Sequence, residues 1–252
     1  GPPPVVTPGA SRGAGAAAEI PEPSHGVSPP AHGDAAPVGE DDFFRHILAK
    51  VEAAFERSDI KKLQERLGEK WFYSVCALPL HRDKDLLLGL NWGANRQTGH
   101  TRQTKQPGPS VIADVAGYPF VRRSLPLLTR YVGELASMNY LNVCPFRSPE
   151  IADLTPLDWR LAIDEFFLET IDYLHPPLTV ILGTTNVAAL AECNLVEFEE
   201  IRIADCGKSV KGFRGVIIGR EGKRHPFGAV PHPNNALTSS ARALIWHKVF
   251  GN

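Results

Sequence analysis

Three short motifs, each an apolar run that ends in a polar loop, constrain this chain more than any other feature of its sequence. They are LLLGLNWGANRQTG at 86–99, NYLNVCPFRS at 139–148 and FGAVPHPNN at 227–235. Each predicts a buried strand followed by a loop that presents one polar side chain, in turn Asn91, Asn142 and His232. Because the carboxyl ends of parallel strands meet at one edge of an open α/β sheet, we expect these side chains at a single site.

The rest of the chain alternates strands with helices, which predicts a largely parallel sheet covered on both faces. Helices are expected at about 41–55, 125–138, 155–174, 187–192 and 239–250, and strands at 86–90, 140–143, 179–182 and 228–230. Weaker strands are expected near 201–203 and 216–218, and an extended piece at 111–115. The expected fold is α/β: a single three-layer α/β/α domain with a central, mainly parallel four-stranded sheet.

The first 39 residues differ in composition from the rest. They are rich in Pro, Gly and Ala and have few large apolar side chains, so they cannot bury enough surface to offset the entropy lost on ordering. We expect residues 1–39 to form a flexible tail and residues 40–252 to form one domain. Thr155-Pro156-Leu157-Asp158 is a helix start, with Thr155 as N-cap.

Composition excludes several classes of protein. The net charge of −1 argues against a protein that is basic all over, although a local basic patch can still bind nucleic acid. The four cysteines include no CxxC pair, so reduced thiols are expected and an iron–sulfur cluster is not. No apolar run has the length of a membrane span and no secretory signal is visible, so a cytoplasmic protein is expected.

The two asparagines each have a structural and a chemical interpretation. Asn91 lies between Gly89 and Gly93, where the backbone lets a ligand approach closely, and its neutral amide can hold a water molecule. Asn142 presents a donor and an acceptor side by side, which complements a nucleobase edge such as that of uracil. The alternative for both is an asparagine that only stabilises its own turn.

His232 stands between Pro231 and Pro233, which restrict its loop. Its imidazole could donate a hydrogen bond to developing negative charge or transfer a proton, although one histidine among nine can also lack any chemical role. There is no P-loop, GxGxxG, HExxH or nucleophile elbow, and His81 and His100 lack metal-ligand spacing. We therefore expect no metal and no cofactor.

Basic residues flank the motifs in two groups. The first group comprises Arg96, His100, Arg102 and Lys105, and the second comprises Lys208, Lys211, Arg214, Arg220, Lys223 and Arg224. They either follow phosphates around a base pocket or form a solvated basic face, and the sequence leaves both open.

Together the motifs resemble those of the uracil-DNA glycosylase superfamily, most of all the single-strand-selective monofunctional uracil-DNA glycosylases. That family has a Gly-x-Asn-Pro-Gly loop followed by Gln-Thr-Gly, an Asn-Leu-Cys-Pro-Leu segment followed by Leu-Thr-Pro, and a late His-Pro-Ser-Pro loop. The matching segments here keep this order and similar spacing. They are 89–93 with 97–99, 142–146 with 154–156, and 232–235.

The resemblance implies a role for each motif. Asn91 would position the attacking water, Asn142 would read the Watson–Crick edge of a flipped base, and His232 would stabilise negative charge on O2 of the departing uracil. The other implied substrate-binding residues are Gly89, Gly93, Trp92 and Phe146. The implied DNA-binding residues are Arg96, Arg102, Asn234, Asn235 and Leu237, with Leu237 as the wedge that fills the gap left by a flipped base.

Two departures from the family pattern bear on the substrate. Trp92 replaces the family's Pro, and its bulk must pack against the pocket, the DNA or the core. The family's base-stacking Phe has no clear match, and Phe120, Phe146 or Trp92 are the candidates for that face. These changes leave the preferred base undetermined, and oxidised or deaminated bases other than uracil are further candidate substrates.

The sequence therefore favours a monomeric, monofunctional DNA glycosylase that hydrolyses the N-glycosidic bond of uracil in single- or double-stranded DNA. A non-catalytic nucleic-acid-binding or lesion-sensing module on the same fold is the first alternative. An enzyme acting on free nucleosides or nucleotides is the second.

Overall fold

A computed structural model describes residues 39–94 and 100–251 of the chain. The expected tail, apart from Gly39, lies outside these ranges, as do Arg96 and the 97–99 segment of the first motif. The first helix, α1 (Glu40–Glu56), begins where the sequence predicts the domain to begin.

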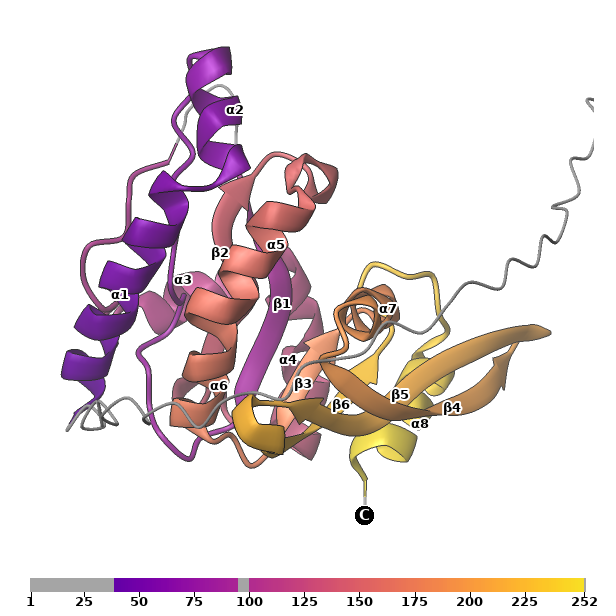
Figure 1. Ribbon diagram of the computed structural model, residues 1–252. Helices are drawn as coiled ribbons and strands as arrows, with labels where there is room; N and C mark the ends of the chain where they lie inside the picture. Colours follow the sequence, from indigo (N-terminus) through magenta and orange to yellow (C-terminus); the bar gives the residue numbers. More distant parts are fainter. Residues whose placement is uncertain (1–38, 95–99, 252) are drawn as a thin grey trace, which may run out of the picture. The chain divides into compact units, whose positions relative to one another are not determined.

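A six-stranded sheet forms the centre of the described chain (Figure 1). Its strands are β1 (Leu86–Gly93), β2 (Asn139–Ser148), β3 (Thr179–Leu182), β4 (Val196–Asp205), β5 (Lys208–Ile218) and β6 (Arg224–Val230). Their order across the sheet is β2-β1-β3-β6-β5-β4. The neighbours β2, β1, β3 and β6 run parallel, so the carboxyl ends of these four strands lie at the same edge.

Side chains of the parallel strands alternate between two buried clusters. Leu86 and Leu88 face one cluster, and Leu87 between them faces the other. Helices α1, α5 (Pro156–Ala162), α6 (Leu168–Leu174) and α7 (Thr184–Glu192) contribute to the first cluster; α3 (Val111–Gly117), α4 (Pro119–Tyr131) and α8 (Ser239–Phe250) contribute to the second. The predicted three-layer α/β/α architecture is confirmed.

The predicted number of strands is too small. Strands β4 and β5 form an antiparallel hairpin that pairs with β6 and extends the sheet from four strands to six. The hairpin turns at Cys206 and Gly207, whose φ angles of 48° and 78° suit a type I′ turn. The sequence indicates these strands only weakly because the edge strand β4 has no fully buried side chain and carries the exposed, charged residues Glu197, Glu199, Glu200 and Arg202.

Two predicted elements differ from the structure. The extended piece expected at 111–115 is helix α3, since Val115 packs into the second cluster and this packing outweighs the strand propensity of Val and Ile. The helix expected at 125–138 lies earlier in the chain. It begins at Pro119, because a residue without an N–H suits the first helical turn, and it ends at Tyr131. A separate 3-10 turn follows at Leu135–Ser137.

The helix predicted from Thr155 is confirmed to Leu174, as α5, a π-helical segment at Ile163–Phe167 and α6. The Thr155 hydroxyl accepts from the Asp158 N–H, and the Asp158 carboxylate accepts from the Thr155 N–H (2.9 Å). The other Asp158 oxygen accepts from the N–H of Asp59 (2.8 Å) and of Ile60 at the start of α2 (Asp59–Leu67). This buried carboxylate therefore holds two helix starts together.

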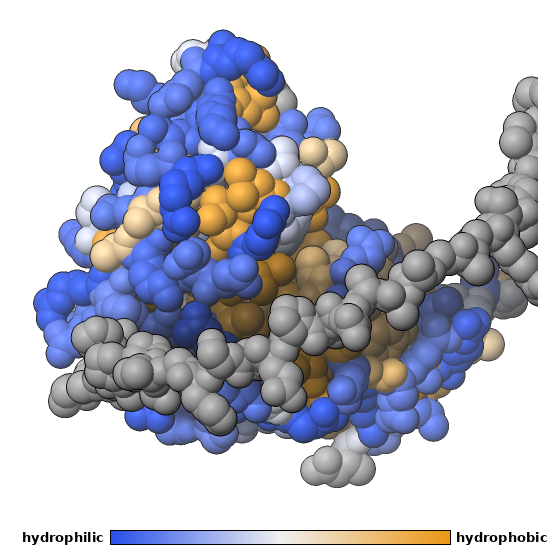
Figure 2. Space-filling model, viewed as in Figure 1, coloured by the Kyte–Doolittle hydropathy of each residue, from blue (hydrophilic) through white to orange (hydrophobic). Residues whose placement is uncertain are grey.

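The remaining elements are two 3-10 turns, at Ile151–Asp153 and Arg220–Gly222. The face that carries α1, α5 and α6 is mostly hydrophilic, with an apolar area over α5 (Figure 2). The four cysteines are free thiols, with Cys76 and Cys144 buried. Within residues 39–94 and 100–251, no helix has both the length and the hydropathy of a membrane span.

Candidate active site

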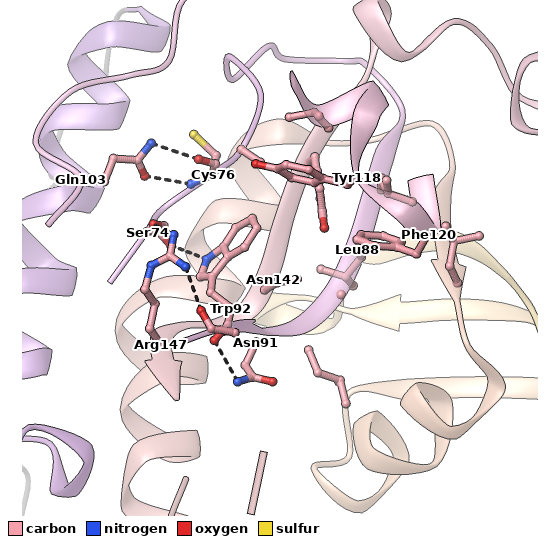
Figure 3. A pocket seen from close by; sticks show the side chains of 18 of the residues that line it. Ser74, Cys76, Leu88, Asn91, Trp92, Gln103, Tyr118, Phe120, Asn142 and Arg147 are labelled. Carbon is pink, nitrogen blue, oxygen red and sulfur yellow. Dashed lines mark hydrogen bonds between the residues drawn. The ribbon is translucent and has the colours of Figure 1, made fainter. Parts of the chain in front are cut away.

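A cleft of about 760 Å³ opens at the carboxyl edge of the parallel strands (Figure 3). Asn91 reaches it from within β1, near the end of that strand, Asn142 from within β2, and His232 from the loop after β6. The expectation that each side chain lies in a loop after its strand therefore holds for His232, whereas Asn91 and Asn142 are still paired in the β1–β2 ladder. The structure thus brings together the three polar side chains that the sequence motifs present. The reason is topological, because β2, β1, β3 and β6 are parallel neighbours and end at one edge.

Gly89 makes room for the Asn142 side chain. The two residues are cross-strand partners in the β1–β2 ladder, and a Cβ on Gly89 would lie 2.2 Å from Asn142 Oδ1. Asn142 is only 3% exposed, yet its amide forms no hydrogen bond with any residue in the described ranges. Because Asn142 lines the cleft, its amide donors and acceptor are available to water or to a ligand there.

The orientation of the Asn91 amide is set by Ser148. The Ser148 hydroxyl donates its proton to the Glu150 carbonyl (2.7 Å), so it can only accept from Asn91 Nδ2 (2.8 Å). Nδ2 also donates to the Trp92 carbonyl (3.2 Å). Oδ1 of Asn91 has no partner among the described residues, which leaves an acceptor at the cleft for a water molecule.

His232 is held as a neutral ring. Its Nδ1 accepts from the Asn234 N–H (3.1 Å), so the proton of the neutral imidazole is on Nε2. Burial lowers the pKa of His232, and the nearby cations Arg123 and Arg242 lower this pKa further. At neutral pH the ring therefore offers an Nε2–H donor to a ligand without carrying a positive charge.

Trp92, which replaces the family's Pro, packs between the core and the cleft. Its indole N–H donates to the Ser74 carbonyl (2.6 Å), its ring lies 5.4 Å from that of Tyr140, and it is 9% exposed. It lines the cleft as predicted, as do Gly89 and Gly93.

Phe146 does not reach the cleft. Pro145 lacks an N–H and cannot continue the ladder, and the β1–β2 register shifts between Asn91 and Trp92 at this point. Phe146 turns instead to a bridge with Tyr73 and is fully buried against Phe55. The expectation that Phe146 contacts the substrate is therefore not supported by its position.

Of the aromatic candidates, Phe120 lies at the cleft beside His232. The two ring centroids are 6.4 Å apart and the planes differ by 28°. Tyr118 lines the same wall and is half exposed, and no sequence motif singles it out.

The implied DNA-binding residues fall into different positions. Asn234 and Asn235 are exposed in the loop after His232, where Arg123 binds the Asn234 side chain and Arg242 donates to the Asn235 carbonyl (2.6 Å). Leu237, the expected wedge, is partly buried against the second cluster and so is not an exposed apolar tip. Arg102 lines the cleft, with its guanidinium 4.5 Å from the Phe72 ring centroid.

The second group of basic residues is largely paired away from the cleft. Arg224 binds Glu197, Lys211 binds Glu200, and Arg220 binds Glu169. Arg214 donates to the carbonyls of α8. Of the two alternatives that the sequence leaves open, a solvated basic face therefore fits these residues better than a rim that binds phosphates around the pocket.

The sequence motifs did not identify three polar residues of the site. Ser148 and Arg147 end β2, and Asn186 lies in the first turn of α7, next to Gly183 with its φ of 131°. Each stands at or just after the carboxyl end of a strand. The rule that identified Asn91 and His232 could therefore have found them.

The arrangement can hold a water at Asn91, bind a polar planar ring at Asn142 and donate a hydrogen bond from Nε2–H of His232. Among the described residues, no cluster of His, Cys, Asp and Glu side chains is suited to a metal ion. Comparison with protein-family models and with curated proteins finds no match to this chain.

Proposed function

We propose that this protein is a monofunctional DNA glycosylase that hydrolyses the N-glycosidic bond of uracil in DNA and leaves an abasic site. Other deaminated or oxidised bases are further candidate substrates. The observation that carries the proposal is the Asn142 amide, which lies at the cleft in a residue only 3% exposed and has no hydrogen-bond partner within residues 39–94 and 100–251. Its adjacent donor and acceptor complement the N3–H and O4 of uracil.

The other two side chains supply the remaining chemistry. Cleavage of the bond produces an oxocarbenium-like sugar and an anionic base. The Asn91 Oδ1 would hold the water that attacks the sugar, and the neutral His232 would donate from Nε2 to the base as it becomes negative. Removal of one such donor typically slows a reaction by ~10²–10³-fold. No lysine lines the described part of the cleft, so we propose hydrolysis without a Schiff base.

The test is alkaline cleavage of an end-labelled oligonucleotide with one uracil, single-stranded or paired with G or A. We expect strand breaks only after alkali treatment, and their loss in His232→Ala. A lesion-sensing module would bind these oligonucleotides and leave them intact. An enzyme for free nucleosides would cleave deoxyuridine without a DNA strand.

A further inference from the structure

The cleft contains a guanidinium that none of the proposed chemical steps uses. Arg147 extends from the end of β2 and lines the cleft beside Trp92. One of its terminal nitrogens donates to the Gly93 carbonyl (2.9 Å) and the other to the Ser74 hydroxyl (2.9 Å), as Figure 3 shows for the residues drawn. Both partners are neutral groups.

The positive charge of Arg147 has no negative partner in the described part of the chain. No carboxylate in residues 39–94 or 100–251 forms an ion pair with it, and its Nε is buried without a hydrogen bond. Burial lowers the pKa of this guanidinium, which nevertheless keeps its charge at any pH a protein tolerates. A charge withdrawn from water is unfavourable unless an opposite charge compensates for it.

The observed contacts of Arg147 do not supply a counter-charge: besides the two hydrogen bonds, its guanidinium carbon lies 6.0 Å from the Trp92 ring centroid, at the outer limit of a cation–π contact, and this weak contact does not neutralise the charge. Neither acceptor is charged, so neither hydrogen bond requires a cation in the cleft. Other arginines of the chain, such as Arg224 with Glu197 and Arg202 with Glu200, do have carboxylate partners. Within the described lining, Asp114 is the one carboxylate, and it is exposed on α3.

We propose that Arg147 forms an anion subsite of the cleft and binds an oxyanion of the substrate. The identity of the substrate as DNA rests on the proposed function, whereas the need for an anion follows from the uncompensated guanidinium. A guanidinium fork fits the oxygens of a phosphate or a carboxylate. Two sources offer this chemistry: a backbone phosphate next to the flipped nucleotide, or a carboxylate on an oxidised base such as 5-carboxyuracil.

Two binding measurements distinguish these sources, and neither requires catalysis. Fluorescence anisotropy would follow the binding of a labelled single-stranded oligonucleotide with a tetrahydrofuran abasic site over a range of KCl concentrations. Calorimetric titration would compare free uracil with free 5-carboxyuracil. The variants are Arg147→Gln and Arg147→Lys. The matched control is Arg160→Gln, which removes an exposed arginine of α5 outside the cleft.

With a phosphate as ligand, Arg147→Gln weakens oligonucleotide binding about 10- to 100-fold and reduces the salt slope by about 0.7. With the carboxylate of an oxidised base as ligand, Arg147→Gln weakens the binding of 5-carboxyuracil by a similar factor, without weakening the binding of uracil. The salt dependence of oligonucleotide binding then stays unchanged. Arg147→Lys keeps the positive charge without the guanidinium fork, so it should bind more tightly than Arg147→Gln in either case.

The proposal is overturned if Arg147→Gln matches Arg160→Gln in both measurements, or if the Gln and Lys variants lose binding alike. Failure of the proposed function has a different signature. In that case wild-type protein leaves every uracil oligonucleotide intact, while the two binding measurements still report on Arg147.

Discussion

Substitution of Gly89 by Ala tests how the sheet prepares the cleft for its ligand. The added Cβ would lie 2.2 Å from Asn142 Oδ1, and real Cβ atoms avoid contacts under 3.0 Å, so the amide must move by roughly 1 Å. Because Asn142 lines the cleft, its side chain can rotate toward that space. We therefore expect a small loss of stability, about 1 kcal/mol, the cost of an unfavourable rotamer.

The effect on activity should be much larger. A displacement of about 1 Å in a positioning group typically costs ~10²-fold in rate, and we expect kcat/KM on a uracil oligonucleotide to fall by that factor. The assay is single-turnover cleavage followed by alkali, with unfolding by urea measured in parallel. Gly133→Ala is the control, because a Cβ there meets nothing within 4 Å.

A double-mutant cycle makes the reasoning refutable. If Gly89 acts only by making space for Asn142, then Gly89→Ala has no further effect in an Asn142→Ala background. Additive losses would show that Gly89 matters for another reason, such as the backbone of β1. Activity of Gly89→Ala within threefold of wild type would refute the role of the amide itself.

Three further predictions follow from the site and its support. Ser148→Ala removes the shorter hydrogen bond of the Asn91 amide and leaves the 3.2 Å bond to the Trp92 carbonyl, so the amide is held less firmly; kcat should fall about 10-fold at unchanged KM, and Ser148→Thr should restore it, whereas a change confined to KM would contradict this. Since the pKa of His232 is lowered, activity should stay constant as the pH falls to 6.5, the ordinary pKa of histidine, and should decline only at lower pH, where protonation of Nδ1 removes the acceptor for the Asn234 N–H. A pH–rate profile in which activity is already lost as the pH falls toward 6.5 would be inconsistent with this. Asp158→Ala leaves several buried N–H groups without an acceptor and should lower the free energy of unfolding by about 3 kcal/mol in urea titrations; a loss below 1 kcal/mol would contradict the role of this carboxylate.

Much of the fold could be predicted because its signals are local. The apolar spacing of α1, the Thr155 capping box and the strand–loop motifs each depend on residues a few positions apart. Topology then makes the strand ends meet, so Asn91, Asn142 and His232 could be expected at one edge of the sheet. The β4–β5 hairpin and α3 are harder to predict from the sequence, because contacts with distant residues outweigh their weak local preferences.

The sequence by itself determined which polar side chains interrupt or follow the apolar runs of the parallel strands, because apolar runs and turn residues are local features of each short segment. Only the tertiary structure decided how those side chains are oriented. The β1–β2 register places Gly89 beneath Asn142, the bulge at Pro145 withdraws Phe146, and Ser148 orients Asn91 from 57 positions away. Such relations depend on the pairing of distant strands, which no local pattern encodes, and they set the chemistry that the cleft can perform.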